Sequence, residues 1–453
     1  MRRAALLTAL LLFAYAFGVP QCAAAQNVPG DTQQPVAPGN SSPGTPTSPT
    51  LTRAQAEALA LKNNPNISAA SLNALASHQL VREQRSALLP AASANVTGVG
   101  AYPGSRLAAG GLNNSILYPR VAAGVTVSQL ITDFGRTNNL LASSELRAKA
   151  EDQAAAATTA DIILAVDQAF FYTLETQALV IVAQHTLDAR QTVVDKISAL
   201  TSAKLRSDLD LSFTKVDASR ARLLLLEAQN NYQDSLAALS ALLGFKDEQD
   251  FQLVDDSVEI HPPPLDVLPL ITEALAQRPE VLALRDQVQA AEKFGHAEHD
   301  LWLPNVSALG VVGLAPIRDE HISSWYGAGG VNLNIPIFNG FLFNARAKTA
   351  DLKTSVEKAR LTDLQNNVAR DVRNAWHDSN RAYERLSITQ QLREQANLAL
   401  DLAQSRYNLG LSSIVEFSQA ELQKTEADIS DTDARYQYRL TEIVLRYTIA
   451  ASN

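Results

Sequence analysis

One long stretch of the chain repeats apolar residues at intervals of seven. It runs from about residue 136 to residue 203. The positions on this grid are Val166, Thr173, Val180, Leu187 and Val194. Such a repeat is typical of a coiled coil, and a helix of this length extends roughly 100 Å at 1.5 Å per residue. After a turn near 203–208 the pattern returns to about residue 243, which predicts a very long helical hairpin.

Two segments before this hairpin alternate apolar residues with small or polar ones, at about 91–102 and 118–130. Alternation with a period of two is typical of a strand whose two faces meet different surroundings. A loop rich in Gly, Asn and Ser, centred on 110–114, separates the two segments. We predict two strands ahead of the hairpin.

The second half of the chain repeats the first. Lys204 to Ser212 align with Gly410 to Ser418 at a constant offset of 206, and Val166 aligns with Val372 at the same offset. Before the strands the offset is 214, so the first strand loop is eight residues longer. Self-similarity of this kind indicates a duplicated architecture.

The repeat sets the expected organisation. We predict a first repeat at 51–244, an irregular linker at 245–268 and a second repeat at 269–453. In the second repeat the strands are expected at about 305–315 and 325–338, and the long helices at about 342–450; in the first, the helices span about 136–243.

The beginning of the chain has the features of a secretory signal peptide over residues 1–25. Arg2 and Arg3 precede a short apolar run, and a small-residue cleavage site ends at Ala25. Cys22 is the only cysteine and would leave with the signal, so no disulfide is expected. Pro and Ser/Thr enrichment over residues 26–50 predicts a disordered leader.

Charge excludes some functions. Without Arg2 and Arg3, 36 basic residues face 47 acidic ones, a formal charge of −11, and no basic patch typical of nucleic-acid binding is present. We find no phosphate-binding loop, nucleophile elbow, zinc spacing or dinucleotide fingerprint, so neither an enzyme nor a cofactor is expected.

Four strands per chain cannot close a membrane barrel, because open sheet edges cannot face lipid. Three chains would supply 12 strands, an even number within the range of outer-membrane barrels. The long helices, with apolar seams and polar flanks, would continue the cylinder as a helical tube. The predicted fold class is mainly α with membrane β, assembled as a homotrimer.

The sequence resembles the TolC-like outer-membrane efflux proteins over about residues 51–449. The resemblance rests on the duplicated order of strands and hairpin, on Leu-Pro at 89–90 and 303–304, and on the Gly-Leu-Ser-x-x-x-Glu turn at 410–416. It implies a homotrimeric exit duct in the outer membrane that reaches into the periplasm. It also implies docking onto a periplasmic adaptor and an inner-membrane pump.

The resemblance also assigns the two hairpin turns to a periplasmic aperture. Glu416 matches a ring aspartate of the family, Asp210 matches the acid of the first repeat, Tyr407 matches a gating tyrosine and Gln419 replaces a second aspartate. Rings of carboxylates at a narrow mouth would favour cations. The alternative is that each acid only stabilises the start of its helix.

The turn residues themselves are the ones that family adaptors are thought to grip. They are Lys204, Leu205, Arg206 and Ser207 in the first repeat and Leu409, Gly410, Leu411 and Ser412 in the second. Gly410 is expected to adopt a positive φ. Lys204 replaces this glycine in the first copy, so the two turns are not expected to be equivalent, and Ser412 replaces a latch arginine of the family.

Two further functions stay open. A soluble periplasmic scaffold or adaptor would explain the helices but not the paired strands. A dedicated metal-ion duct has only His296 and His299, three residues apart on a helix, in its favour, and a solvated helix end is the simpler interpretation. Trp302, Trp325 and Tyr326 flank the strands and would suit a lipid interface or internal packing.

Overall fold

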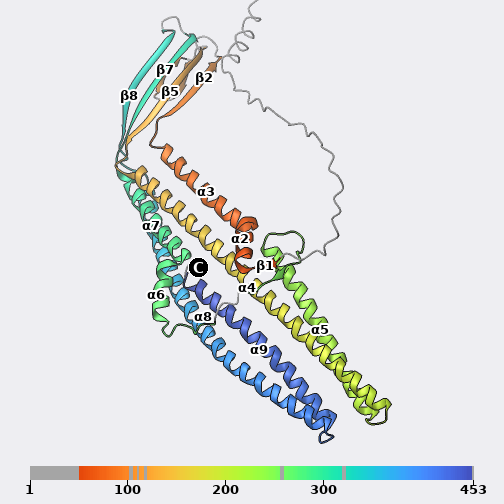
Figure 1. Cartoon of the computed structure of the whole chain (residues 1–453). Coiled ribbons are helices and arrows are strands. Elements are labelled where there is room, and N and C mark those ends of the chain that lie inside the picture. Colours follow the sequence, from red (N-terminus) through yellow and green to blue (C-terminus); the bar gives the residue numbers. More distant parts are fainter. Residues whose placement is uncertain are drawn as a thin grey trace, which may run out of the picture. The chain divides into compact units, whose positions relative to one another are not determined.

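In the computed structural model, the described residues are 50–100, 106–109, 112–116, 120–255, 260–318 and 323–450. They belong to one compact unit, which spans residues 48–453. The predicted signal peptide and all but the last residue of the predicted leader lie outside the described residues. The four longest helices and a four-stranded sheet make up most of the unit (Figure 1).

Each repeat contains one helix of 67 residues and one of 35. The first repeat has α4 (Arg136–Ser202) and α5 (Asp208–Leu242), and the second has α8 (Leu342–Asn408) and α9 (Ile414–Thr448). Equal lengths at an offset of 206 show that the duplication is structural. In the helical part α9 contacts both α4 and α8, while α5 packs on α4.

Shorter helices precede the strands of each repeat. They are α2 (Arg53–Asn63) and α3 (Pro65–Ser86) in the first repeat and α6 (Leu268–Gln277) and α7 (Pro279–His299) in the second. Helices α3 and α7 both begin with proline. Proline is well tolerated at the first helical position, because the backbone N–H that it lacks would have no partner within the helix there. A 3-10 turn, η1 (Asp300–Trp302), follows α7.

The long strands form one antiparallel sheet. Its members are β2 (Ala91–Val99), β5 (Arg120–Thr132), β7 (Asn305–Ile317) and β8 (Trp325–Asn334), in the order β2-β5-β7-β8. Within the described residues, the outer edges of β2 and β8 pair with no strand. The sheet lies at one end of the unit and the hairpin turns at the other (Figure 1).

Several details of the sheet differ from the sequence predictions; strand β5, for example, ends at Thr132 rather than 130. The loop around 110–114 carries a short hairpin of β3 (Arg106–Ala109) and β4 (Leu112–Ile116). The last strand ends at Asn334 rather than 338, since Pro336 has no N–H to continue the ladder. Strand β7 extends two residues further than predicted, to Ile317.

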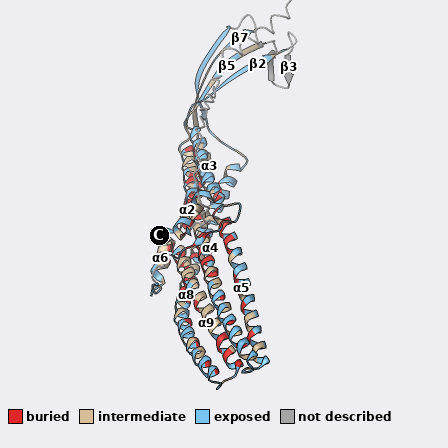
Figure 2. Cartoon of the chain, turned by 45° about the vertical axis from the view of Figure 1, so that its right-hand side comes forward, coloured by how far each residue is buried: buried red, intermediate tan, exposed pale blue. Residues whose placement is uncertain are grey.

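Buried side chains concentrate where the short helices meet the long ones (Figure 2). In the first repeat Ala60 and Val166 belong to a cluster that also holds β1 (Thr50–Leu51) and β6 (Gln252–Leu253), which pair in parallel. In the second repeat the equivalent residues Ala274 and Val372 occupy a matching cluster. Both cores are built from the same positions of the repeat.

Helix α4 contains an 18-residue window with a mean hydropathy of 1.3, apolar enough to cross a membrane by length and composition. Its apolar residues Val166, Phe170 and Leu174 are buried within the protein. Over the whole apolar window, 28 % of the residues are buried.

Candidate functional site at the helix tips

The chain reverses direction in two five-residue turns, the first tip (residues 203–207) and the second tip (residues 409–413). Gly410 has φ +74°, which confirms the predicted left-handed turn, and Lys204 has φ +59°. The N–H of Leu205 donates to the carbonyl of Leu200 at 2.8 Å, and that of Leu411 to Arg406 at 2.9 Å. This is the same helix-ending motif twice. The backbones of the tips are equivalent, contrary to the expectation from Lys204, which accepts a conformation that glycine adopts without strain.

The predicted aperture acids begin the returning helices. Ser207 caps α5 by accepting from the N–H of Asp210 at 3.1 Å, and Ser413 caps α9 by accepting from that of Glu416 at 3.3 Å. Both acids lie in the first turn of a helix, where the helix dipole favours negative charge. This position suits the helix-stabilising interpretation, and it also places both carboxylates at the outer end of the hairpins.

A cation–π contact joins the first tip to the second. The guanidinium of Arg206 lies 4.2 Å from the centre of the Tyr407 ring, and one of its nitrogens donates to the Tyr407 carbonyl at 2.9 Å. The other face of Tyr407 stacks on Phe417 with a centroid distance of 5.5 Å. Tyr407 thus links the two hairpins.

The Tyr407 ring is 4 % exposed, and its hydroxyl has no hydrogen-bond partner among the described residues. Burial raises the pKa of this hydroxyl, the carboxylate of Asp210 raises it further and the Arg206 cation opposes them. Asp210 therefore lies within electrostatic reach of Tyr407. Glu416 instead faces Arg406, with 3.6 Å between carboxylate and guanidinium, and Gln419 is exposed on α9.

The residues predicted to contact an adaptor divide into two groups. Leu205, Leu409 and Leu411 are 66–74 % exposed, an unusual display of leucine at a turn. Lys204, Ser207 and Gly410 are also exposed. Arg206 is half-buried against Tyr407, and the hydroxyl of Ser412 is buried.

Sequence reasoning missed the role of Arg206, because the latch arginine of the family falls on Ser412. It also missed the apolar base of the tips, where Ile197 packs with Tyr407, Ile414 and Phe417. The only sequence signal for this contact was the presence of Arg206 and Tyr407 at positions that are not equivalent in the two repeats. Their contact becomes visible only in the packing of the two hairpins.

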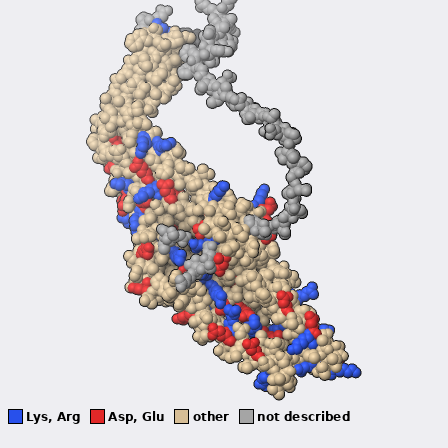
Figure 3. All heavy atoms as spheres, in the orientation of Figure 1, with Lys and Arg blue, Asp and Glu red and all other residues tan. Residues whose placement is uncertain are grey.

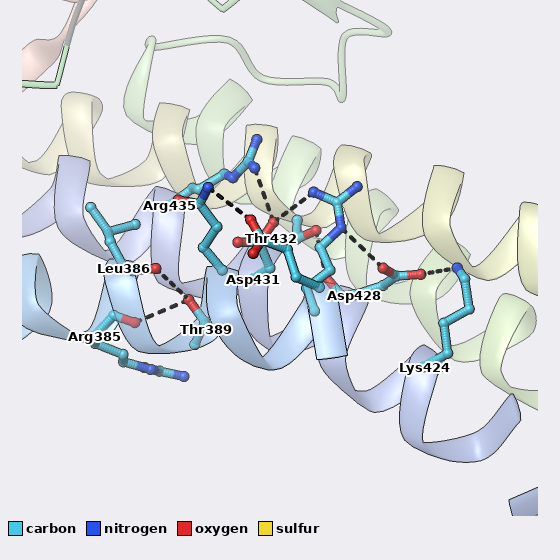
Figure 4. Close-up of polar contacts among 11 residues, drawn as sticks. Arg385, Leu386, Thr389, Lys424, Asp428, Asp431, Thr432 and Arg435 are labelled. Atoms are coloured by element: carbon cyan, nitrogen blue, oxygen red, sulfur yellow. Dashed lines mark hydrogen bonds and ion pairs between the residues drawn. The ribbon is translucent and has the colours of Figure 1, made fainter. Parts of the chain in front are cut away.

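A network of ion pairs lies further along the second hairpin (Figure 4). Arg393 of α8 bonds Asp428 and Asp431 of α9 at 3.2 and 3.1 Å, and Arg435 bonds Asp431 at 3.0 Å. The buried Arg190 of α4 pairs with Glu421 of α9. These residues line a cavity of about 440 Å³ between the three helices.

Two buried carboxylates of α4 face carboxylates of other helices. Asp167 lies beside Glu57 of α2, and Glu175 beside Asp433 of α9. Burial and the neighbouring negative charge raise the pKa of each to about 7, while Arg53 and Arg385 respectively oppose the shift. Glu175 and Asp433 form one of the links between the two repeats.

The remaining candidates do not meet at one site. His299 pairs with Asp351 at 3.0 Å and His296 is exposed; in the described part of the chain no three His, Cys, Asp or Glu residues are grouped to hold a metal ion. Trp302 packs edge-on against Phe343 at 5.4 Å.

The two faces of the sheet differ in chemistry. Cross-strand partners share a face, so the register assigns one face that is apolar and exposed: Val96, Val125, Val127, Val312, Leu314, Trp325, Val331 and Leu333. The other face is mostly small or polar, with Val99, Leu130, Leu309 and Val311 as interruptions: Ser93, Asn95, Thr97, Thr126, Ser128, Ser307, Asn332 and Asn334. Tyr326 lies on this second face, across Gly124 and Gly313, which is the packing within the protein that the sequence allowed as the alternative to a lipid interface.

Known sequences match this architecture. The sequence profile of the outer membrane efflux proteins matches residues 58–245 and again residues 270–450. The chain belongs to this family. TolC of Vibrio cholerae is 25 % identical over 416 residues, covering 86 % of this chain and 88 % of its own. OprJ of Pseudomonas aeruginosa is 24 % identical over 395 residues, covering 85 % and 81 %.

Solved structures show the same fold. The CmeC outer membrane channel of Campylobacter jejuni superimposes with a TM-score of 0.75 at 17 % identity, covering 93 % of this chain and 94 % of CmeC. The open state of the MtrE outer membrane channel of Neisseria gonorrhoeae gives 0.73 at 18 % identity, with 88 % of each chain covered. The chain is thus an efflux family member with the fold of outer-membrane channels.

Proposed function

We propose that this protein is the outer-membrane exit duct of a tripartite efflux or type I secretion system. It passes small molecules or proteins passively across the periplasm and the outer membrane. The observation that carries the proposal is the sheet, which has one exposed apolar face, one polar face and two open edges. A sheet of this kind suits lipid on one side and a wet lumen on the other.

Surface charge supports the same arrangement. Lys, Arg, Asp and Glu are spread over the visible helical surface, whereas the visible surface over the sheet carries few of them (Figure 3). A band without charges is what a hydrocarbon layer requires. A soluble scaffold would gain nothing from such a band, so this observation argues against that alternative.

Closure of the barrel requires further copies of the chain. Strands β2 and β8 present unpaired backbone at both edges of the sheet, and three copies would bring 12 strands together. The signal peptide over residues 1–25 would direct export. The tips would then form the periplasmic mouth, where Asp210 and Glu416 supply negative charge and the Arg206–Tyr407 contact holds the hairpins together.

The exposed leucines of the tips would serve as the docking surface for a periplasmic adaptor, which connects the duct to an inner-membrane pump. Leu205, Leu409 and Leu411 would fill apolar recesses of the adaptor, while Arg206 would be unavailable as long as it covers Tyr407. The transported molecule would be selected by the pump.

Single-channel conductance of the detergent-purified protein in planar bilayers tests the proposal. We expect small, cation-selective steps for the wild type and larger or less selective steps for Asp210→Ala/Glu416→Ala. Asp208→Ala, at the neighbouring exposed first-turn acid, is the control and should behave as wild type. An unchanged double variant would remove the aperture role of the two acids, and a monomeric protein without conductance would contradict the duct.

A further inference from the structure

A cavity of about 420 Å³ lies between the two repeats, where the short helices meet the long ones. The first repeat lines it with the start of α2 and the middle of α4, and the second with the junction of α6 and α7 and the end of α9. Its apolar walls are formed by Ala160, Ile163, Leu164, Ile443 and Ala450. Small-molecule sites have volumes of about 300–1,000 Å³ and apolar walls with a few placed polar groups. The cavity therefore has the size and the walls of a ligand site.

One polar group of this cavity lacks a hydrogen-bond donor. Asp167 of α4 lines the cavity and is 3 % exposed, and its Oδ1 receives no hydrogen bond from any described residue. A buried acceptor without a donor is unfavourable, and buried polar groups in folded proteins are nearly always hydrogen-bonded. The position of Asp167 therefore points to a ligand that brings a donor into the cavity.

Two carboxyl groups share one cation at this end of the cavity. Nη1 of Arg53 lies 3.7 Å from Oδ2 of Asp167, and its Nε lies 3.4 Å from Oε1 of Glu57. This oxygen of Glu57 is also buried and receives no hydrogen bond within the described part of the chain. The two carboxyl groups face each other, and they can share a hydrogen bond only when one of them holds a proton. With all three groups ionised, the cluster carries one net negative charge.

The other two arginines of the cavity are already paired. Arg278 donates to both oxygens of Glu280, at 3.3 and 2.9 Å, and its guanidinium lies 5.6 Å from the centre of the Tyr447 ring. Arg446 donates to Glu442 at 2.8 Å. The charge that is not balanced therefore lies at the pair of carboxyl groups, which favours a cationic ligand over an anionic one.

We propose that this cavity binds a small organic cation, with its N–H groups donating to Asp167 and its apolar body between α4 and α9. The ammonium or amidinium group would form charge-assisted hydrogen bonds, which are shorter and stronger than neutral ones. Ile163, Leu164 and Ile443 would cover the apolar body. The inference goes beyond the proposed function, and the site is complete within one chain.

A metal ion or a water molecule suits the cavity less well. In the ranges that the structure describes, no three His, Cys, Asp or Glu residues are grouped to hold a metal ion, and Ca²⁺ takes about six to eight oxygen ligands. A water fills only about 30 Å³ and needs two to four polar partners. The apolar walls offer no such partners, whereas they suit a hydrocarbon body.

The bound cation would take the place of a proton. Burial and the neighbouring Glu57 raise the pKa of Asp167 to about 7, while Arg53 opposes them. Across the cavity, the hydroxyl of Tyr447 donates to Asp161, and burial together with this contact raises the pKa of that hydroxyl, so it keeps its proton. Cation binding should therefore release close to one proton below pH 7. The apparent affinity should rise about tenfold for each pH unit below the pKa and level off above it.

Calorimetric titration of the full-length protein in detergent with benzamidine tests the site. The amidinium of this probe supplies N–H donors on an apolar ring and stays protonated between pH 6 and pH 8. We expect one site per chain with a dissociation constant of about 1 mM or lower at pH 8, and about tenfold weaker binding at pH 6. Benzamidine should also raise the urea midpoint, because it binds only the folded chain. Affinity that falls from pH 6 to pH 8 would overturn the exchange of cation for proton.

Asp167→Asn keeps the shape of the side chain and removes its charge. It should weaken benzamidine binding at least about tenfold and abolish the pH dependence. Glu175→Gln is the matched control, because Glu175 is a buried acid of the same helix with a pKa also raised to about 7, yet it does not line this cavity. The control should bind as the wild type does. Wild-type affinity in Asp167→Asn would overturn the site.

Glu57→Gln keeps the site testable if Asp167→Asn does not fold. It leaves the carboxyl of Asp167 in place and removes the negative charge that raises its pKa. The rise in affinity should therefore move to lower pH, which loss of packing alone would not produce. A pH profile identical to that of the wild type would contradict the paired carboxyl groups.

Two further probes separate the chemistry of the ligand. Benzoate carries the opposite charge on the same ring and would use Arg53, Arg278 and Arg446; tighter binding of benzoate than of benzamidine would make the cavity an anion site and overturn the inference. Benzyltrimethylammonium keeps the positive charge but has no N–H, so it should bind at least about tenfold more weakly than benzamidine. Equal affinity of the two cations would overturn the assigned hydrogen bond to Asp167.

Single-channel conductance separates this inference from the proposed function. A wild type that conducts but does not bind benzamidine would contradict the cation site and leave the duct intact. A protein that binds benzamidine with release of a proton but never conducts would contradict the duct and leave the site intact.

Discussion

The two long hairpins have the same length and the same turn, yet opposite chemistry at the same level. In the first hairpin Ala183, Leu225 and Ala228 are buried, with Leu187 packed against them. The equivalents of Ala183, Leu187 and Leu225 in the second hairpin are Thr389, Arg393 and Asp431. Arg393 and Asp431 form an ion pair of the network in Figure 4, and the hydroxyl of Thr389 donates to carbonyls of its own helix. The backbone geometry of the duplication has been kept while an apolar contact became an ionic one.

This difference shows what the helical packing requires. The spacing of the helices is set by small residues such as Ala228 and its equivalent Ala434, both buried. Between them, a Leu–Leu contact and an Arg–Asp contact fill similar volumes. The ionic version loses solvation energy that the apolar version does not, so the two hairpins are expected to differ in their tolerance of substitution.

The largest effect is expected when the acid of the second hairpin is placed in the first. Leu225→Asp buries a carboxylate beside Ala183 and Leu187 without a cation at the position of Arg393. An unpaired buried charge costs about 3–5 kcal/mol of stability. Urea unfolding followed by circular dichroism measures this loss. Leu226→Asp, at the adjacent position with 53 % exposure, is the control and should cost less than about 1 kcal/mol.

Leu225→Asp/Leu187→Arg sharpens the same comparison. It rebuilds the ion pair of the second hairpin in the first and should recover part of the loss. A single variant as stable as the wild type would mean that the first hairpin is not closed by its apolar cluster.

Much of this architecture could be predicted from the sequence, because it depends on repetition. The seven-residue grid through Val166, the turn at Gly410 and the offset of 206 each depend on local spacing, and local spacing determined the long helices. Strand ends were less predictable, since Pro336 ends β8 inside an alternating pattern that continues to Ile337.

The contacts at the helix tips could not be predicted from the sequence, for a physical reason. The Arg206–Tyr407 contact joins residues 201 positions apart, and the relevant chemistry is a ring between a cation and Phe417. No periodicity encodes such a pair. The acids Asp210 and Glu416 were found because the two hairpin turns resemble those of the family, but whether they line a mouth depends on copies of the chain that one sequence does not position.

The reverse exchange, from the ionic to the apolar residues, should change stability in the opposite direction. Arg393→Leu/Asp431→Leu installs the residues of the first hairpin in the second. Replacing a fully buried ion pair by apolar residues is often neutral or stabilising by about 1–4 kcal/mol, and the gain is smaller here because the Arg393 side chain is 45 % exposed. We expect an equal or higher urea midpoint than in the wild type. Here the network extends to Asp428 and Arg435, so the gain should lie at the lower end.

Arg393→Leu alone is the informative contrast. It leaves Asp431, which is 4 % exposed, with Arg435 as its cation, and should be less stable than both the wild type and the double variant. A double variant that is markedly less stable than either single one would show that the ion pairs, rather than the filled volume, hold the second hairpin.

The smallest expected effect concerns the link between the repeats, where Glu175 faces Asp433. The pKa of Glu175 is raised from 4.5 to about 7, so the folded chain holds a proton there that the unfolded chain releases. Its contribution to stability is therefore fully present below about pH 4.5, is lost as the pH rises towards 7, and is constant above. Asp167, whose pKa is also raised to about 7, adds to the same trend.

Glu175→Gln keeps a neutral hydrogen-bonding side chain at every pH, so it should reduce the fall in stability between pH 5 and pH 8 and leave the variant more stable than the wild type at pH 8. Urea midpoints at the two pH values measure this, with Glu384→Gln at an exposed position of α8 as the control for loss of a charge. An unchanged slope in Glu175→Gln would mean that Arg385 keeps both carboxylates ionised. The carboxyl pair between the repeats would then be held by its cation.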